Sequence, residues 1–149
     1  LLDGARDRRI EPMLRLSRRQ YRCLYSGALS PGLEAAAPHI VFLARDSAFT
    51  RELIELGWGR SWGVFVVAPP DCTHEQLRRH FRKFLKARDE RGRGLIFRFY
   101  DPRVLPVYLR ACNPIEADEF FGPVERFVMD GHGAPTVLER PRTGAPAGR

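Results

Sequence analysis

The sequence contains very little lysine, although it is strongly basic. Lys83 and Lys86 are its two lysines, and arginine supplies the rest of the 25 basic residues. An arginine excess of this kind, beside abundant alanine, glycine and proline, is typical of a GC-rich genome. We therefore interpret the net charge of +7 as a basic surface, which suits an acidic protein partner, rather than as a sign of nucleic-acid binding.

Cysteine and long apolar runs are also scarce. Cys23, Cys72 and Cys112 are widely spaced and odd in number, which argues against a disulfide framework and favours a reducing compartment such as the cytoplasm. No apolar run is as long as a membrane span, and no signal peptide is visible. The first residue is leucine rather than methionine, which leaves open whether a leader precedes it.

The stretch 95–109, LIFRFYDPRVLPVYL, has the pattern of a buried strand that leads into a helix through a short turn. Its first six residues are apolar apart from Arg98, as in a strand covered on both faces. Asp101 can cap the next helix, and Pro102 suits the first helical position. Pro106 would remove a hydrogen bond inside that helix, so we expect a kink there or a later helix start.

Arg98, Asp101 and Arg103 would then gather at one end of this strand. Functional sites in α/β proteins often lie at such a strand end, but the same geometry suits a structural corner. An arginine within a buried strand needs a partner, because an unpaired buried charge is costly. We expect Asp101 or another carboxylate to pair with Arg98.

Hydrophobic runs and helix signals alternate along the rest of the chain. Ser47 is a typical helix cap, and Thr73 with Gln76 is a typical capping box. The pattern predicts strands at 21–25, 40–43, 64–68 and 124–129, and helices at 48–56, 74–88 and 115–121. This order favours a single α/β domain over residues 1–129, with a mixed or mostly parallel central sheet flanked by helices. Residues 130–149, rich in Gly, Pro and Arg, are expected to form a disordered tail.

Catalytic and metal-binding patterns are weak in this sequence. Cys72, His74 and His80 are the candidates for a metal cluster, but His74 and His80 lie about 240° apart around a helix. The sequence shows no nucleophile elbow and no phosphate cradle, because the glycines at 92 and 94 precede a predicted strand rather than a helix. We therefore predict no metal, no cofactor and no enzymatic activity, and a binding role fits better.

Seven motifs occur in a characteristic order along the chain. They are LLDGARD at 1–7, CLY at 23–25, APHIV at 37–41, GWGRSWGV at 57–64, LRRHFR at 77–82, FRFYDPRVL at 97–105 and FFGPV at 120–124. Together they resemble the bacterial family of unknown function DUF4123, whose members act as adaptor chaperones of type VI secretion. The match covers residues 1–129, FRFYDPRVL is its most specific part, and the family's opening strand is truncated here.

The resemblance implies a cytoplasmic, non-catalytic protein that binds a toxic effector and helps to load it onto the trimeric VgrG spike. It also implies that Arg98, Tyr100, Asp101, Pro102 and Arg103 form a structural family signature. Two other classes of protein remain as alternatives. One is a nucleic-acid-binding module that uses the basic face of the helix 74–88. The other is a small hydrolase or transferase that uses Asp101 with Arg98 or His80.

Partner-binding residues are predicted on the helix 74–88 and on the loop after the helix 48–56. Arg78, Arg79 and Arg82 lie on the first of these, and the planar arginine fork pairs well with carboxylates. Trp58 lies on the loop and would add an aromatic anchor, although core packing is the alternative for this residue. The sequence therefore predicts that the effector or the spike contacts these four side chains.

Overall fold

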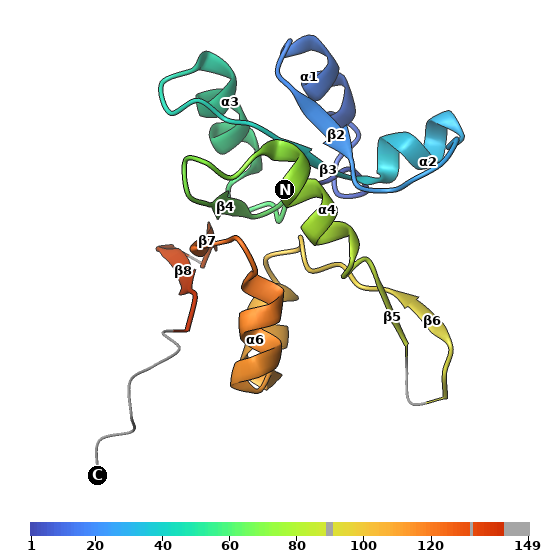
Figure 1. Cartoon of the computed structure of the whole chain (residues 1–149). Helices are drawn as coiled ribbons and strands as arrows, with labels where there is room; N and C mark the ends of the chain where they lie inside the picture. The colour runs from blue at the N-terminus through green and yellow to red at the C-terminus, as the bar shows by residue number, and fades with distance from the viewer. Residues whose placement is uncertain (89–90, 132, 142–149) are drawn as a thin grey trace.

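The computed structural model describes residues 1–88, 91–131 and 133–141. Within these ranges the chain forms six short helices and eight short strands (Figure 1). In chain order they are β1 (Leu2–Asp3), α1 (Ile10–Leu16), β2 (Tyr21–Cys23), α2 (Pro31–Ala36), β3 (Pro38–Val41), α3 (Ala48–Gly57), β4 (Phe65–Val67), α4 (His74–Arg82), β5 (Lys86–Arg88), β6 (Gly94–Ile96), α5 (Leu105–Ala111), α6 (Pro114–Phe121), β7 (Arg126–Asp130) and β8 (Pro135–Glu139).

Every strand pairing described is antiparallel, so the predicted mixed or mostly parallel central sheet is wrong. The strands form three small sheets, with the orders β1-β3-β2, β4-β7-β8 and β5-β6. A parallel pair needs a long crossover that returns the chain to the same end of the sheet. Here β5–β6 and β7–β8 are hairpins, and α2 between β2 and β3 has only 6 residues. The predicted order of elements lacks α2 and β5, and an alternation of strands and helices does not specify strand direction.

The stretch predicted to be the central buried strand is instead the end of an exposed hairpin. Strand β6 stops at Ile96, and the side chains of Leu95 and Ile96 are 50% and 64% exposed. The buried part is the turn that follows, where Phe99 and Tyr100 enter the core. Helix α5 begins only at Leu105, which places Pro106 in its first turn, where a proline costs no hydrogen bond.

The helix caps predicted at Ser47 and Thr73 are confirmed, whereas the cap predicted at Asp101 is wrong, because the N-cap of α5 is Val104. Helix α4 is shorter than expected. The Ser47 side chain accepts a hydrogen bond from the Thr50 N–H, and Thr73 and Gln76 form the capping box of α4. Helix α4 ends at Arg82, because Lys86–Arg88 turn away as β5. A capping side chain specifies where a helix begins, whereas its end depends on how the following residues pack.

Part of the predicted disordered tail is ordered structure. Residues 135–139 form β8, which pairs with β7 from Arg126↔Glu139 to Asp130↔Pro135. The Arg140 guanidinium donates to Asp118 at 2.8 Å and to the Gly122 carbonyl at 2.8 Å, which fastens the end of this hairpin to α6. Residues 132 and 142–149 of the predicted tail lie outside the described residues.

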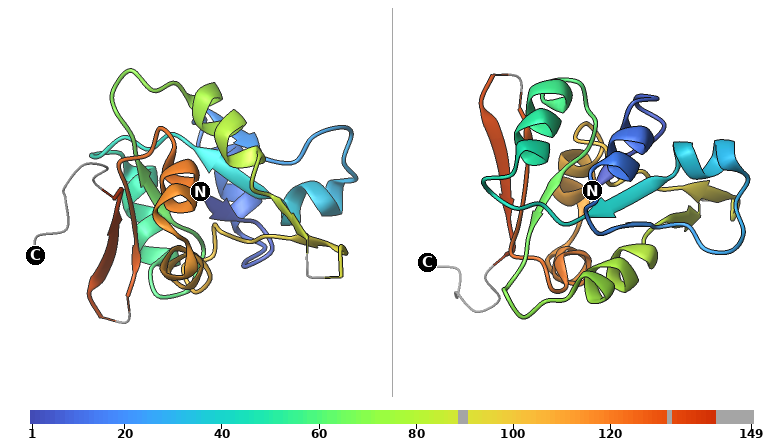
Figure 2. Two further views of the ribbon diagram at one scale, coloured as in Figure 1. Left: turned by 60° about the horizontal axis from the view of Figure 1, so that its bottom comes forward. Right: turned by 90° about the horizontal axis from the view of Figure 1, so that it is seen from above.

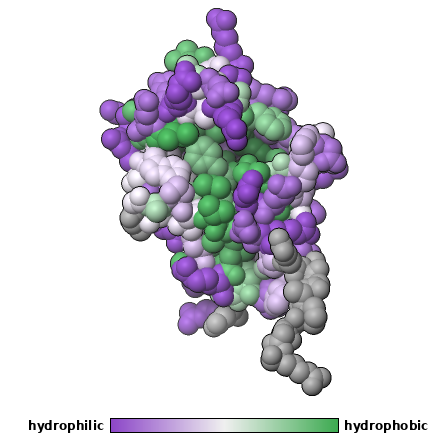
Figure 3. All heavy atoms as spheres, turned by 90° about the vertical axis from the view of Figure 1, so that its left-hand side faces the viewer, coloured by the Kyte–Doolittle hydropathy of each residue, from purple (hydrophilic) through white to green (hydrophobic). Residues whose placement is uncertain are grey.

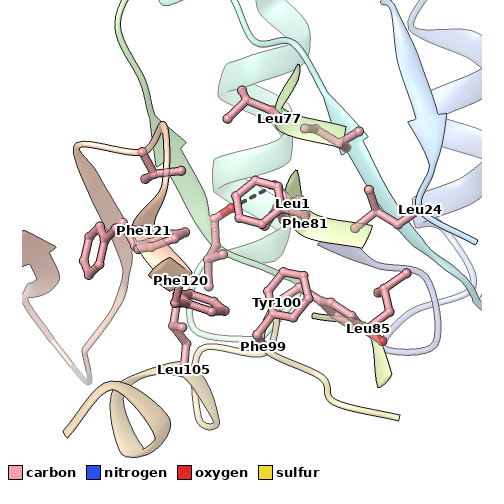
Figure 4. Close-up of a cluster of buried hydrophobic side chains, with 14 of the residues drawn as sticks. Leu1, Leu24, Leu77, Phe81, Leu85, Phe99, Tyr100, Leu105, Phe120 and Phe121 are labelled. Atoms are coloured by element: carbon pink, nitrogen blue, oxygen red, sulfur yellow. Dashed lines mark hydrogen bonds between the residues drawn. The ribbon is translucent and has the colours of Figure 1, made fainter. Parts of the chain in front are cut away.

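The core consists of two apolar clusters on opposite faces of the sheets. Helices α4, α5 and α6 cover one face, where Phe81, Phe99 and Phe120 are fully buried (Figure 4). Helices α1 and α3 cover the other face, around the buried side chain of Trp62. Figure 2 shows α1 and α3 on one side of the strands and α4 on the other. The first two residues of the chain contribute to different clusters, Leu1 to the first and Leu2 to the second, because successive side chains of an extended segment point to opposite faces.

Candidate functional site

The signature residue Arg98 forms an ion pair with Asp3 of β1. The Asp3 side chain is 1% exposed, and the Arg98 guanidinium donates a hydrogen bond to its Oδ2 atom. This hydrogen bond raises the pKa of Arg98, so the guanidinium stays charged. The prediction that a carboxylate pairs with Arg98 is confirmed, and the carboxylate is Asp3 rather than Asp101. Sequence analysis did not single out Asp3, although it lies in the LLDGARD motif.

Asp101 has its own arginine partner, two residues further along the chain. Its Oδ1 accepts hydrogen bonds from Arg103 Nε at 3.0 Å and from the Arg103 backbone N–H at 2.9 Å. Its Oδ2 accepts a third from Arg103 Nη2 at 2.6 Å. Burial alone would raise the pKa of Asp101, but the bonds from Arg103 outweigh burial and hold this pKa below its ordinary value.

Tyr100 and Pro102 complete the buried signature. Burial and the neighbouring Tyr25 raise the pKa of Tyr100 far above its usual value, which keeps the phenol neutral. The two buried carboxylates at this site are both engaged by arginines. This arrangement supports the structural role implied by the family resemblance, because it ties the turn 98–103 to strand β1.

The predicted partner-binding arginines differ in what they contact. Arg78 donates from Nε to the Cys23 carbonyl at 3.1 Å, so this side chain fastens α4 to β2. Arg79 is exposed and Arg82 is half-buried on the same helix. Together with Lys83, Lys86 and Arg88, these two arginines form a surface that we call the basic surface.

Trp58 does not join these arginines. It follows α3, on the opposite face of the sheets from α4, and its ring centroid lies 6.1 Å from that of Phe65. Its side chain is half-buried and lines a small apolar pocket together with Leu53 and Ile54. Sequence analysis therefore placed Trp58 near the arginines of α4, whereas in the fold it follows a helix on the opposite face of the sheets.

The hairpin β5–β6, which we call the arm, is a feature that sequence analysis missed. It extends away from the body of the molecule, as Figure 1 shows. All six residues of its two strands are exposed, including Leu95 and Ile96. The signal in the sequence was the pair of glycines at 92 and 94, which we assigned only to a turn. The arm adjoins the basic surface, because Lys86 and Arg88 belong to β5.

A large open groove separates β3 from β4, and sequence analysis did not predict it. Most of the groove lining is apolar, including Phe42, Val66 and Leu77. Phe42 is 44% exposed at its edge. Figure 3 faces this side of the molecule and shows a band of hydrophobic side chains between hydrophilic borders.

No group of three potential metal ligands occurs among the residues that the structure describes. The Nε2 atom of His80 lies 2.7 Å from the Phe120 carbonyl oxygen. Cys23, Cys72 and Cys112 are free thiols. Within the described ranges, no helix is long and apolar enough to cross a membrane.

Buried histidines lead to a prediction on pH dependence. Burial lowers the pKa values of His39, His74 and His80 from the ordinary value of about 6.5. Below that pH the unfolded chain therefore binds more protons than the folded protein, and stability falls as the pH falls. We expect the urea midpoint of unfolding to decrease between pH 7.5 and pH 5. A midpoint that is constant or rises over this range would contradict the prediction.

Fold and site together define a small protein of antiparallel sheets and short helices, with an arginine–carboxylate cluster inside and a basic arm outside. The family model described as "Domain of unknown function (DUF4123)" matches residues 1–119. The chain therefore belongs to this family, as its motifs predicted. Comparisons with curated proteins and with solved structures found no match.

Proposed function

We propose that this protein is an adaptor chaperone that binds a type VI secretion effector and helps to load it onto the VgrG spike. The observation behind the proposal is the string Phe97–Leu105, which resembles the signature of such adaptors. Family membership over residues 1–119 agrees with it. The protein would act in the cytoplasm, where its three free thiols would remain reduced.

The exposed surface supports a binding role. Specific protein interfaces combine apolar or arginine anchors with a polar rim. The arm offers Leu95 and Ile96, and the neighbouring basic surface offers five cationic side chains. An acidic segment of the effector would fit this combination, because arginine binds carboxylates with two parallel hydrogen bonds.

Reversing charge on the basic surface tests the adaptor role. We expect the triple variant Arg79→Glu, Arg82→Glu, Lys83→Glu to weaken co-purification with the toxin encoded beside its gene at least 10-fold. Attraction would become repulsion at the interface, and like charges there cost several kcal/mol. Arg78 is left unchanged, because its bond to Cys23 holds the fold together. Circular dichroism should show an unchanged fold.

A matched control carries the same change in net charge on a different surface. Arg8, Arg19 and Arg60 are exposed and lie outside the basic surface, so their replacement by glutamate should leave toxin binding intact. Equal loss in both triple variants would indicate a general charge effect. If the complex stays intact after the first triple change, the toxin binds a different surface of the protein. Binding of nucleic acid with steep salt dependence, and no toxin binding, would favour the alternative module.

A further inference from the structure

The arm is a two-stranded sheet with an open edge on each side. Among the residues that the structure describes, β5 and β6 pair only with each other. All six residues of these strands are exposed, and the arm projects from the body of the molecule (Figure 1). An isolated pair of strands is marginally stable in water, and a third strand stabilises it. The arm is therefore suited to pair with one more strand.

The hydrogen bonds of the arm indicate which backbone groups of β5 point outward. The Phe97 N–H donates to the Leu85 carbonyl at 3.0 Å, so these two residues form a hydrogen-bonded pair. Such pairs alternate along antiparallel strands with pairs that are not hydrogen-bonded. Ala87 lies two residues further along, so its backbone bonds to β6. The backbone N–H and C=O groups of Lys86 and Arg88 therefore point away from β6, along the open edge.

The two faces of the arm differ in chemistry. Side chains alternate between the faces of a strand. In the register of the hairpin, Lys86, Arg88 and Ile96 share one face, whereas Ala87 and Leu95 share the other. At the base of the arm, this second face continues into the larger core cluster. A strand added along β5 would have cationic neighbours on one face and an apolar surface on the other.

Charge on the arm selects the kind of strand that can pair with it. The described residues 86–88 and 91–96 include four basic side chains and no acidic one. The Arg88 guanidinium donates to the Gly92 carbonyl at 3.3 Å, and its several N–H donors allow it to bind a carboxylate as well. Charged residues on a sheet edge prevent pairing with a like edge, so β5 of a second copy is disfavoured. Opposite charges directly across two strands attract, which favours an acidic strand.

We propose that β5 pairs with one antiparallel strand of an acidic partner protein, in which two carboxylates lie opposite Lys86 and Arg88. Between them, an apolar residue lies opposite Ala87 and extends the apolar face of the arm. The β6 edge is less suited, because Gly94 and Ile96 carry no charge that would select a partner. The inference rests on the proposed function for the identity of the partner, since the strand would then belong to the effector.

Hydrogen exchange with a synthetic peptide tests this register on the full chain. The probe is Thr-Glu-Val-Glu-Val-Glu-Thr, acetylated and amidated, at millimolar concentration. We expect it to slow exchange of the Lys86 and Arg88 amides at least 10-fold, because they become paired. The Gly94 and Ile96 amides, on the other edge, should keep their rates. Unchanged exchange of the Lys86 and Arg88 amides would overturn the proposal.

Two control peptides separate strand pairing from general attraction between charges. One has lysine in place of each glutamate and should protect neither edge. The other, Glu-Glu-Glu-Val-Val-Thr-Thr, has the same composition as the probe without the alternation, and it should protect the β5 amides much less. Equal protection by this block peptide would overturn the proposed register. Protection of the Gly94 and Ile96 amides instead would assign the strand to β6, and protection that grows with protein concentration alone would assign it to a second copy.

A charge exchange tests the two cations directly. In the variant Lys86→Glu, Arg88→Glu, protection should pass from the acidic peptide to the lysine peptide. The variant Arg8→Glu, Arg19→Glu has the same net charge and should keep the preference for the acidic peptide, because both residues are exposed outside the arm. An unchanged preference in the first variant would overturn the proposal.

Toxin co-purification distinguishes this inference from the proposed function. If the unaltered protein binds the toxin and Lys86→Glu, Arg88→Glu binds it equally well, the strand assignment is wrong and the adaptor proposal stands. If the unaltered protein binds no toxin, the adaptor proposal is wrong, whereas peptide protection of the Lys86 and Arg88 amides still supports an acidic strand on β5.

Discussion

Replacing Phe120 with alanine is expected to lower the free energy of unfolding by about 3–5 kcal/mol. The Phe120 side chain is fully buried at the centre of the larger cluster. Its ring centroid lies 4.9 Å from that of Phe84, 5.1 Å from Tyr108 and 5.6 Å from Phe99. Alanine would leave a cavity among side chains from three segments of the chain, and they cannot all move to fill it.

Urea unfolding followed by circular dichroism measures this loss directly. Val107→Ala is the matched control, because Val107 is 59% exposed on α5 and should change stability by less than about 1 kcal/mol. A Phe120→Ala variant as stable as that control would contradict the position of Phe120 in the core. If Phe120→Ala does not fold, Phe120→Leu provides a smaller cavity and should still lower the urea midpoint.

Replacing Arg98 with alanine is expected to lower the free energy of unfolding by about 1–3 kcal/mol. The substitution leaves Asp3 buried without its arginine, and a buried carboxylate that loses a partner is costly. Arg98 itself is 40% exposed, so water can reach the site and the loss stays below that for a fully buried pair. Thermal unfolding measures this loss of stability, and a toxin-binding assay on the same sample measures whether binding is retained.

A double-mutant cycle isolates the pair from other effects. Asp3→Asn and Arg98→Ala should each destabilise the protein, and the double variant should cost less than the sum of both losses. Arg22→Ala is a suitable control, because Arg22 is exposed and bonds only to its neighbour's carbonyl among the contacts given for its side chain. An Arg98→Ala variant with unchanged melting temperature and lost toxin binding would show that Arg98 belongs to the interface instead.

Local chemistry explains most of what was predicted correctly. Ser47 and Thr73 cap their helices because a side-chain oxygen can satisfy an N–H only a few residues away. Pro106 similarly places the start of α5, since proline fits only the first turn. Family membership also followed from short motifs in order. Each of these conclusions depends on residues that are close in the sequence.

The partners of distant residues could not be predicted from such patterns. Arg98 was expected to pair with a carboxylate, but Asp101, three residues away, pairs with Arg103 instead. The actual partner, Asp3, lies 95 residues earlier. Trp58 and Arg79 were grouped because their segments are neighbours in sequence, yet α3 and α4 cover opposite faces. Only the folded chain decides which residues meet across a sheet.

The sequence by itself determined where α3 and α4 begin, which side chains are apolar, and to which family the chain belongs. Tertiary structure alone decided that the strands are antiparallel and that Leu95 and Ile96 face solvent. An apolar run has the same pattern whether a strand is central or part of a projecting hairpin. The burial of a strand depends on which distant segments pack against its faces. The direction of a strand depends on the end of the sheet to which the preceding connection returns the chain. These are properties of contacts between distant segments, and no local pattern encodes them.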